Sequence, residues 1–170
     1  MSTPDVIIRP FEVADADRLW PILDETIRKG DTYAIDPDLS REELIHLWCE
    51  TPRATFVAVR GDTILGTYYI KTNQQGGGSH VCNCGYITSA QARGLGVARG
   101  MCLHSQDVAR QMGYLAMQFN FVVASNRGAI ALWTRLGFQT IGRIPLAFRH
   151  PAEGLLDALV MHKSLVADPR

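Results

Sequence analysis

Residues 91–100, QARGLGVARG, place three glycines and two arginines between a β-rich run and a helical pattern. A strand that leads through such a turn into a helix presents unpaired N–H groups and the positive end of the helix dipole at one point. Phosphate binds at such points, since Gly94 and Gly96 carry no Cβ and Arg93 and Arg99 add charge. The segment predicts a phosphate site; the alternative is a plain turn that needs glycine only for its geometry.

The kind of phosphate ligand is narrowed by what the sequence lacks. No Lys-Ser or Lys-Thr follows the glycines, which excludes a Walker loop. The third glycine is displaced to Gly100, and the next strand, MQFNFVVASN, ends without the acidic residue that holds a ribose, so a dinucleotide site is disfavoured. The remaining class is a group carrier that contains a pyrophosphate.

Two asparagines lie within apolar strand-like runs, Asn83 in VCNCG and Asn120 in QFNFV. A carboxamide can donate hydrogen bonds through its N–H groups and accept them through its oxygen, so it can bind a polar ligand in two ways. The alternative is that both side chains cap distortions of their strands, because asparagine is disfavoured there. Two locally unfavourable choices in corresponding places favour a role in substrate binding.

The cysteines and histidines give weaker signals. The four cysteines form no disulfide framework in a chain of 170 residues. Cys82 and Cys84, with His80 nearby, lack the usual zinc spacing, so we expect buried thiols and no metal. Cys84 as a covalent nucleophile is disfavoured, because no His-Asp pair accompanies it. His80 is either a proton relay or a solvated side chain at a loop edge.

Hydrophobic spacing and turn residues predict the elements that position these groups. Strands are expected at 6–10, 55–59, 63–71, 80–88, 115–123, 138–144 and 156–162, and helices at 15–29, 40–48, 96–112 and 127–136, with a loop at 72–79. The order β-α-α-β-β-β-α-β-α-β-β indicates a single mixed α/β domain over residues 1–170, with one helix crossing between the fourth and fifth strands.

The charge balance excludes partners that need a strong overall field. Lys plus Arg equals Asp plus Glu at 17 each, so we expect neither nucleic-acid nor membrane binding. Apolar stretches stay short of a bilayer span, and the N-terminus lacks the pattern of a signal peptide. These features predict a cytoplasmic protein.

Two spaced motifs resemble the GCN5-related N-acetyltransferase (GNAT) superfamily. Gln91-x-x-Gly94-x-Gly96 after a strand is similar to its acyl-CoA signature, and NRGAIALWTRLGF, residues 126–138, is similar to its second motif. The element order also matches, so the resemblance covers nearly the whole chain. It implies the GNAT fold, with a mixed central sheet, splayed fourth and fifth strands and helices on both faces, and acetyl-CoA as co-substrate.

The resemblance also implies where acetyl-CoA binds. The backbone of Ile87 and Thr88 would pair with the pantetheine arm, and the Ile87 amide would stabilise charge on the thioester oxygen. Asn126 would hold the arm from the other side. The pyrophosphate would bind the backbone amides of Arg93, Gly94, Leu95, Gly96, Val97, Ala98 and Arg99.

One position departs from the superfamily pattern. Many members have a tyrosine, the acid for the leaving thiolate, seven residues after the asparagine of the second motif; here Trp133 stands there. An indole cannot protonate sulfur at neutral pH, so the usual acid is absent. We expect Trp133 to pack against the pantetheine or at the helix interface. A non-catalytic acyl-CoA-binding module is therefore an alternative.

A narrower resemblance covers residues 30–162 and points to the branch of the superfamily that acetylates L-azetidine-2-carboxylate, a proline analogue. That branch relies on asparagines in the wedge, which fall on Asn83, Asn120 and Asn126. Tyr33 and Tyr86 either line the acceptor pocket or belong to the core.

The function expected from this branch is detoxifying, direct sequential transfer of an acetyl group from acetyl-CoA to a small amino or imino acid. The alternative acceptor is another amine: an antibiotic, a polyamine or a peptide N-terminus. A homodimer through the C-terminal strands is possible for the superfamily, although DALVMH is equally typical of a core strand.

Overall fold

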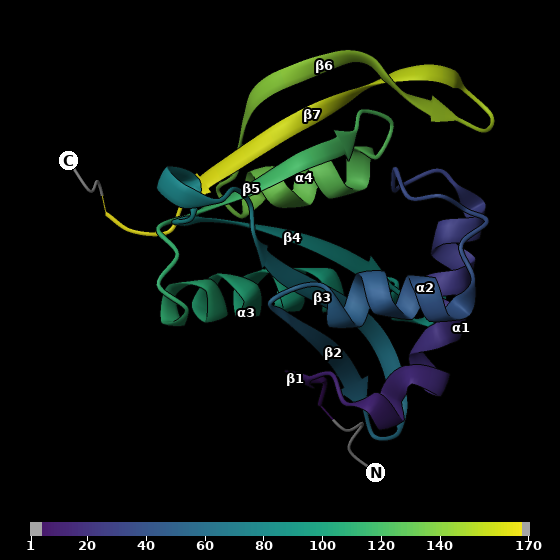
Figure 1. The fold of residues 1–170 in the computed structure, drawn as a ribbon. Coiled ribbons are helices and arrows are strands. Elements are labelled where there is room, and N and C mark those ends of the chain that lie inside the picture. Colours follow the sequence, from purple (N-terminus) through teal and green to yellow (C-terminus); the bar gives the residue numbers. More distant parts are fainter. Residues whose placement is uncertain (1–4, 168–170) are drawn as a thin grey trace.

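The computed structural model describes residues 5–167, whose strands form one seven-stranded mixed sheet in the order β1-β2-β3-β4-β5-β7-β6 (Figure 1). The predicted order of elements is confirmed. The strands are β1 (Ile7–Pro10), β2 (Ala54–Arg60), β3 (Thr63–Thr72), β4 (Val81–Thr88), β5 (Ala116–Val123), β6 (Gln139–His150) and β7 (Gly154–Ser164). The helices are α1 (Ala16–Lys29), α2 (Arg41–Ile45), α3 (Val97–Gln111) and α4 (Arg127–Arg135).

The two N-terminal helices follow their sequence signals. Helix α1 buries its apolar face and ends at Gly30, whose φ of 66° is the left-handed conformation that glycine adopts readily. Helix α2 begins with the predicted capping box, in which Ser40 Oγ accepts from the Glu43 amide at 3.2 Å and the Glu43 carboxylate accepts from the Ser40 amide at 2.8 Å. It then continues as a π-helical turn, His46–Glu50, that buries Trp48.

Strands β4 and β5 are parallel and separate almost at once. Only Val81 with Ala116 and Cys82 with Met117 are in register as partners. One residue further, the Asn83 side chain spans the widening gap, and its Nδ2 donates to the Gln118 carbonyl oxygen at 2.9 Å. The predicted splayed strands are therefore confirmed, and the wedge between them opens toward the C-terminal ends of both.

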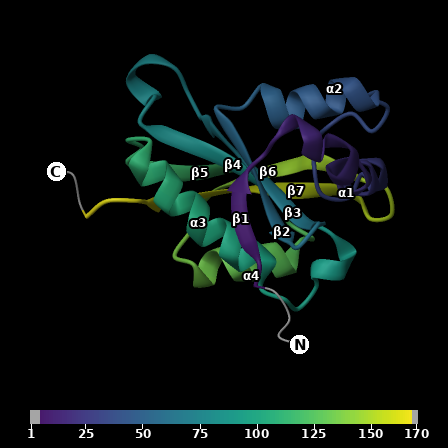
Figure 2. The same ribbon diagram turned by 90° about the horizontal axis from the view of Figure 1, so that it is seen from below.

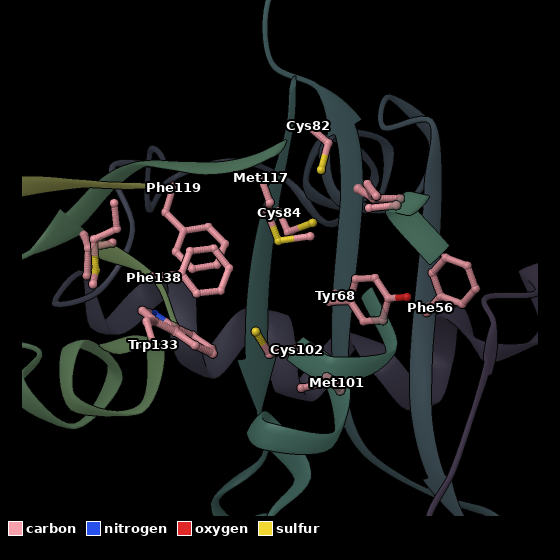
Figure 3. Packing of buried hydrophobic residues seen from close by; sticks show 14 of the residues in the cluster. Phe56, Tyr68, Cys82, Cys84, Met101, Cys102, Met117, Phe119, Trp133 and Phe138 are labelled. Carbon is pink, nitrogen blue, oxygen red and sulfur yellow. The ribbon is translucent and has the colours of Figure 1, made fainter. Parts of the chain in front are cut away.

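Helices α3 and α4 cover one face of the sheet and α1 and α2 the other (Figure 2), and a hydrophobic core lies on each face. One core, between the sheet and helices α3 and α4, contains Cys82, Cys84 and Cys102 together with Phe119, Phe138 and Trp133 (Figure 3). The other core packs α1 and α2 against the opposite face and contains Leu19, Leu23, Trp48 and Ile87. Because side chains alternate along a strand, neighbouring residues of β4 belong to different cores.

The C-terminal hairpin is longer than predicted. Pro145 and the exposed Leu146 interrupt the strand pattern, and the register between β6 and β7 shifts between Ile144 and Phe148. Leu146 adopts a positive φ of 50°, and its amide donates to Asp157 Oδ1 at 2.9 Å. Sequence spacing could not reveal this bulge, because a carboxylate on the partner strand supports it. Ala158 and Met161 are fully buried, so β7 is a core strand, and the homodimer stays a prediction.

Candidate active site

The wedge contains two cavities that meet. One has a volume of about 340 Å³ and lies toward β3, the π-helical turn after α2 and the bulge of β5; we call it the acceptor cavity, after the ligand expected there. The other, of about 490 Å³, lies toward α1 and the N-terminus of α3, and we call it the donor cavity. The residues that line both are Thr32, Tyr86, Asn126, Ala129 and Trp133. The arrangement can hold two ligands end to end, with their adjoining ends beside Tyr86.

At this junction the hydroxyl of Tyr33 binds the backbone of Tyr86. Tyr33 Oη accepts from the Tyr86 N–H at 2.8 Å and donates to the Tyr86 carbonyl oxygen at 2.7 Å. Tyr33 comes from the segment between α1 and α2. Because both backbone groups of Tyr86 bond its hydroxyl, they face the open wedge rather than β3. Desolvation raises the pKa of the Tyr33 hydroxyl well above its usual range, which keeps it neutral.

The same geometry bears on Ile87, the expected donor to the thioester oxygen. Backbone groups of successive strand residues point to opposite edges, so Thr88 shares the direction of Tyr86 and Ile87 points toward β3, where its register partner is Thr67. Ser89, two residues after Ile87, has backbone groups that point the same way as those of Ile87, and its amide donates to the Leu65 carbonyl oxygen of β3 at 2.9 Å. The amide on the open edge is that of Tyr86, not that of Ile87. The alternation of backbone directions along β4 is the signal that could have distinguished Tyr86 from Ile87.

The side chains of Tyr86 and Trp133 belong to the core as well as to the cavities. Their rings lie 5.0 Å apart, and Phe119 packs against both. The Tyr86 hydroxyl is within 2.7 Å of Ser105 Oγ, and burial raises its pKa. Trp133 is 7% exposed. The hydroxyl of Tyr86 is engaged with Ser105 inside the core, and Trp133 closes the wedge from the α4 side.

The donor cavity and the glycine-rich turn beside it have features that fit a pyrophosphate carrier. Gly94 and Gly96 have φ values of 75° and 72°, and a Cβ on either would meet no protein atom within 4 Å. The space above the turn is open, and glycine is required there by conformation. Ser89 Oγ is buried without a hydrogen-bond partner among the described residues, and Ser89 lines this cavity, so a polar ligand group would satisfy it.

The predicted phosphate segment contributes unevenly. Arg93 and Ala98 line the donor cavity, whereas Gly94, Leu95, Gly96, Val97 and Arg99 do not. Val97 is buried in the core beneath α3, while Leu95 and Arg99 are exposed. The Gly100 amide makes the first helical bond, to Gly96 O at 2.9 Å, which leaves the amides of residues 97–99 at the free end of α3. The Arg93 and Leu95 amides instead donate within the preceding turns.

Of the other predicted donor residues, Ile87 and Thr88 line the donor cavity and Asn126 lines both. Asn126 Oδ1 accepts from the Ala129 amide at 3.2 Å and caps α4. Its position at the junction is therefore fixed by the helix. Lys29, which also lines the donor cavity, was not predicted, because it reads as a last-turn cation of α1.

Asn83 and Asn120 both line the acceptor cavity but are not bonded to each other. Asn83 is buried, and besides donating to Gln118 its Oδ1 accepts from Tyr69 Oη at 3.4 Å. Asn120 is exposed; its Nδ2 donates to Asn73 Oδ1 at 2.6 Å, and its Oδ1 accepts from Gln118 Nε2 at 2.9 Å. Asn83 thus also matches the alternative interpretation of a residue that supports a strand distortion.

The remaining candidates are two buried thiols and one exposed imidazole. Cys82 and Cys84 are buried, and burial raises the pKa of the Cys84 thiol well above its usual range. His80 is exposed in the turn directly before β4. Within residues 5–167 no group of three or more His, Cys, Asp or Glu side chains could hold a metal ion. Over the same residues, no helix has both the length and the apolar character needed to cross a membrane.

Known proteins share both the sequence pattern and this architecture. The sequence profile of the acetyltransferase (GNAT) family matches residues 20–138. The chain is 32% identical over 151 residues to N-acetyltransferase aca1 of Schizosaccharomyces pombe, which covers 79% of this chain and 72% of that protein.

Solved structures give the same result for the fold. A GCN5-related N-acetyltransferase from Kribbella flavida superimposes with a TM-score of 0.89 at 40% identity, over 94% of this chain and 97% of the other. A phosphinothricin acetyltransferase from Sinorhizobium meliloti, in complex with acetyl-CoA, superimposes with a TM-score of 0.81 at 18% identity, over 94% and 88%. The latter likeness concerns the fold alone.

The chain therefore belongs to the acetyltransferase (GNAT) family. It is an acetyl-CoA-dependent N-acetyltransferase of the GNAT type, as the sequence motifs predicted.

Proposed function

We propose that this enzyme transfers the acetyl group directly from acetyl-CoA to the amine of a small amino or imino acid, with both substrates bound in the wedge at once. The observation that carries the proposal is the meeting of the two cavities at the Tyr86 backbone. Acetyl-CoA supplies a thioester: the acceptor nitrogen bonds the acetyl carbon, the C–S bond breaks, the amine proton passes to water and coenzyme A leaves as the thiolate.

The donor end is held by backbone amides more than by side chains. The free amides of residues 97–99, the Ser89 hydroxyl and the Arg93 guanidinium are assigned to the pyrophosphate. Thr88, whose backbone shares the direction of Tyr86, is assigned to the pantetheine arm. Trp133 and Asn126 are assigned to the wall beside the arm on the α4 side.

The Tyr86 N–H is assigned to the negative charge that develops on the thioester oxygen. A preorganised amide in a site that excludes water contributes about 3 kcal/mol to such stabilisation. A carbonyl oxygen that accepts from this N–H must displace the Tyr33 hydroxyl, since both need the same donor. The Tyr33 hydroxyl therefore has to leave the Tyr86 N–H before the acetyl group is transferred.

Direct transfer is favoured over an acetyl-enzyme by the state of the one thiol at the acceptor cavity. Cys84 lines that cavity, but its raised pKa keeps it as the unreactive thiol. Asn83 and Asn120 are assigned to orienting the acceptor, through the hydrogen-bonding capacity that their protein partners leave over.

The test is the release of free thiol from acetyl-CoA in the presence of a panel of amines: azetidine-2-carboxylate, proline, acyclic amino acids, a polyamine, an aminoglycoside and a peptide. Turnover with amino or imino acids, with initial-rate patterns of a ternary complex, is expected. Turnover only with the other amines would show that the acceptor belongs to a different class. Tight coenzyme A binding without turnover would show that the protein is a non-catalytic binding module.

The acceptor assignment has its own variants. Asn120→Ala removes an exposed side chain and is expected to leave the melting temperature nearly unchanged, so any rise in the acceptor KM reports on binding. Asn83→Ala also leaves the Gln118 carbonyl without its partner and should destabilise the protein by about 1–2 kcal/mol. If both variants keep the wild-type rate at subsaturating acceptor, neither asparagine orients the substrate.

A further inference from the structure

The side chains around the acceptor cavity carry an unbalanced charge. Among the described residues that line it, Lys71 is the only charged one, and no carboxylate lines the cavity. The remaining polar lining consists of hydroxyl and carboxamide groups, with the tyrosines kept neutral by desolvation. A ligand in this cavity therefore meets one positive charge that the protein does not neutralise there.

Lys71 is placed to reach the ligand from the rim. It is the register partner of Asn83 on the neighbouring strand, so the two side chains project from the same face with Cβ atoms about 5 Å apart. Its Nζ lies 5.4 Å from the ring centroid of Tyr69, whose hydroxyl in turn donates to Asn83. Within residues 5–167 Lys71 forms no ion pair, and its side chain is exposed.

We propose that Lys71 binds the carboxylate of the acceptor and so selects amines that carry a carboxylate close to the nitrogen. This inference rests on the proposed function, since it names the group that recognises an amino or imino acid in the acceptor cavity. An ammonium and a carboxylate form a charge-assisted hydrogen bond, and the neighbouring Asn83 carboxamide adds a neutral partner on the same face.

The separation along β4 suits this assignment. Asn83 and Tyr86 are three residues apart, about 10 Å at the rise of a strand. The four-carbon stem of Lys71 and the body of a small amino acid together span that distance, with the carboxylate at the Lys71 end and the amine at the Tyr86 end. The same positive charge disfavours a polyamine, which would bring like charges together.

The experiment compares acceptors that differ only in the carboxylate: azetidine-2-carboxylate against azetidine-2-carboxamide, and an acyclic amino acid against its amide. Lys71→Met removes the charge and keeps the length, and Lys71→Arg keeps the charge. Arg149→Met, which removes an exposed cation from β6, is the matched control. Acetyl-CoA affinity and the melting temperature are measured for each variant to establish that the fold and the donor site are intact.

Lys71→Met is expected to raise the KM of the carboxylate acceptors by about 10- to 100-fold, with kcat changed much less, and to leave the KM of the amides unchanged. The preference for acid over amide should therefore disappear, return in part in Lys71→Arg, and persist in Arg149→Met. Retention of the wild-type preference by Lys71→Met would overturn the role of Lys71 while leaving the proposed acceptor class intact.

A binding measurement keeps the test independent of turnover. With coenzyme A present, N-acetylated azetidine-2-carboxylate should raise the melting temperature of the wild type more than the corresponding amide does, and Lys71→Met should lose that difference. If wild-type enzyme acetylates only amines without a carboxylate and shows no such difference, the proposed acceptor class fails and the role of Lys71 fails with it.

Discussion

The hydroxyl of Tyr33 bridges the backbone N–H and C=O of Tyr86, at 2.8 Å and 2.7 Å, on the edge of β4 that no strand covers. An exposed strand edge with unpaired groups is a template for another backbone-like partner. In this protein a side chain from the α1–α2 segment satisfies that edge at the point where the two cavities meet. Under the proposed binding of the thioester to the Tyr86 N–H, acetyl-donor binding and the position of this segment are coupled.

Tyr33→Phe is expected to tighten acetyl-CoA binding by about fivefold, because the thioester carbonyl no longer competes with a hydroxyl whose hydrogen bond is worth about 1 kcal/mol. The free energy of unfolding should fall by about 1–2 kcal/mol, since the segment loses its anchor. Isothermal titration with acetyl-CoA and chemical denaturation measure the two effects. Free coenzyme A, which lacks the thioester carbonyl, should gain less. Unchanged or weaker acetyl-CoA binding would mean that Tyr33 stays on Tyr86.

Gly96→Ala tests the turn before α3. At a φ of 72° an alanine is strained, so the variant should lose about 1–2 kcal/mol of stability and bind acetyl-CoA more weakly as the amides of residues 97–99 shift. Gly100→Ala is the control, because its Cβ would meet only Ile8 Cδ1, at an ordinary 3.9 Å, and alanine favours the helix. Thermal melts and coenzyme A titrations of both variants are the measurements. Equal behaviour of the two would show that the turn conformation does not matter.

Cys84→Ala should keep activity within a few-fold of the wild type, because a thiol with a raised pKa is neither a nucleophile nor a base. The variant loses a small buried group and about 1 kcal/mol of stability. Intact-protein mass spectrometry of the wild type with acetyl-CoA and no acceptor should show no added acetyl group. A covalent acetyl adduct that Cys84→Ala abolishes would replace direct transfer by a two-step mechanism.

Asp15 predicts how stability depends on pH in the acid range. Its carboxylate accepts from Arg9 at 2.7 Å and 2.8 Å, from Arg18 at 2.7 Å and from the Glu12 amide at 2.9 Å. Chiefly through the Arg9 hydrogen bond, these partners lower the pKa of Asp15 from 3.8 to about 2. A folded-state pKa below the unfolded value stabilises the protein above the unfolded pKa, and that contribution is lost as pH falls from about 4 to about 2.

Denaturation curves between pH 2 and pH 7 measure this contribution, which is on the order of 2 kcal/mol. Asp15→Asn is expected to be less stable at neutral pH and to show a flatter loss of stability in that acid window. The same acid slope in wild type and variant would assign the loss to other carboxylates.

Much of the fold follows from local patterns in the sequence. The apolar stripe and terminal glycine of α1, the capping box of Ser40 and Glu43 and the glycine-rich turn before α3 depend on neighbours within a few residues, which a single sequence displays. The hairpin bulge at Leu146 could not be predicted from local sequence, because the residue that supports it, Asp157, lies on another strand.

For the site, the sequence indicated the class of ligand, and the tertiary structure decided which groups face the cavities. Residues 91–100 and 126–138 identified the donor ligand class, since helix ends and glycine turns are local features. Only the structure revealed three relationships: Tyr86 rather than Ile87 lies at the open edge, Tyr33 bridges its backbone groups, and Lys71 pairs with Asn83. Each depends on the register of one strand against another or on a contact between distant segments, and strand alternation turns a shift of one residue into the opposite side of the sheet.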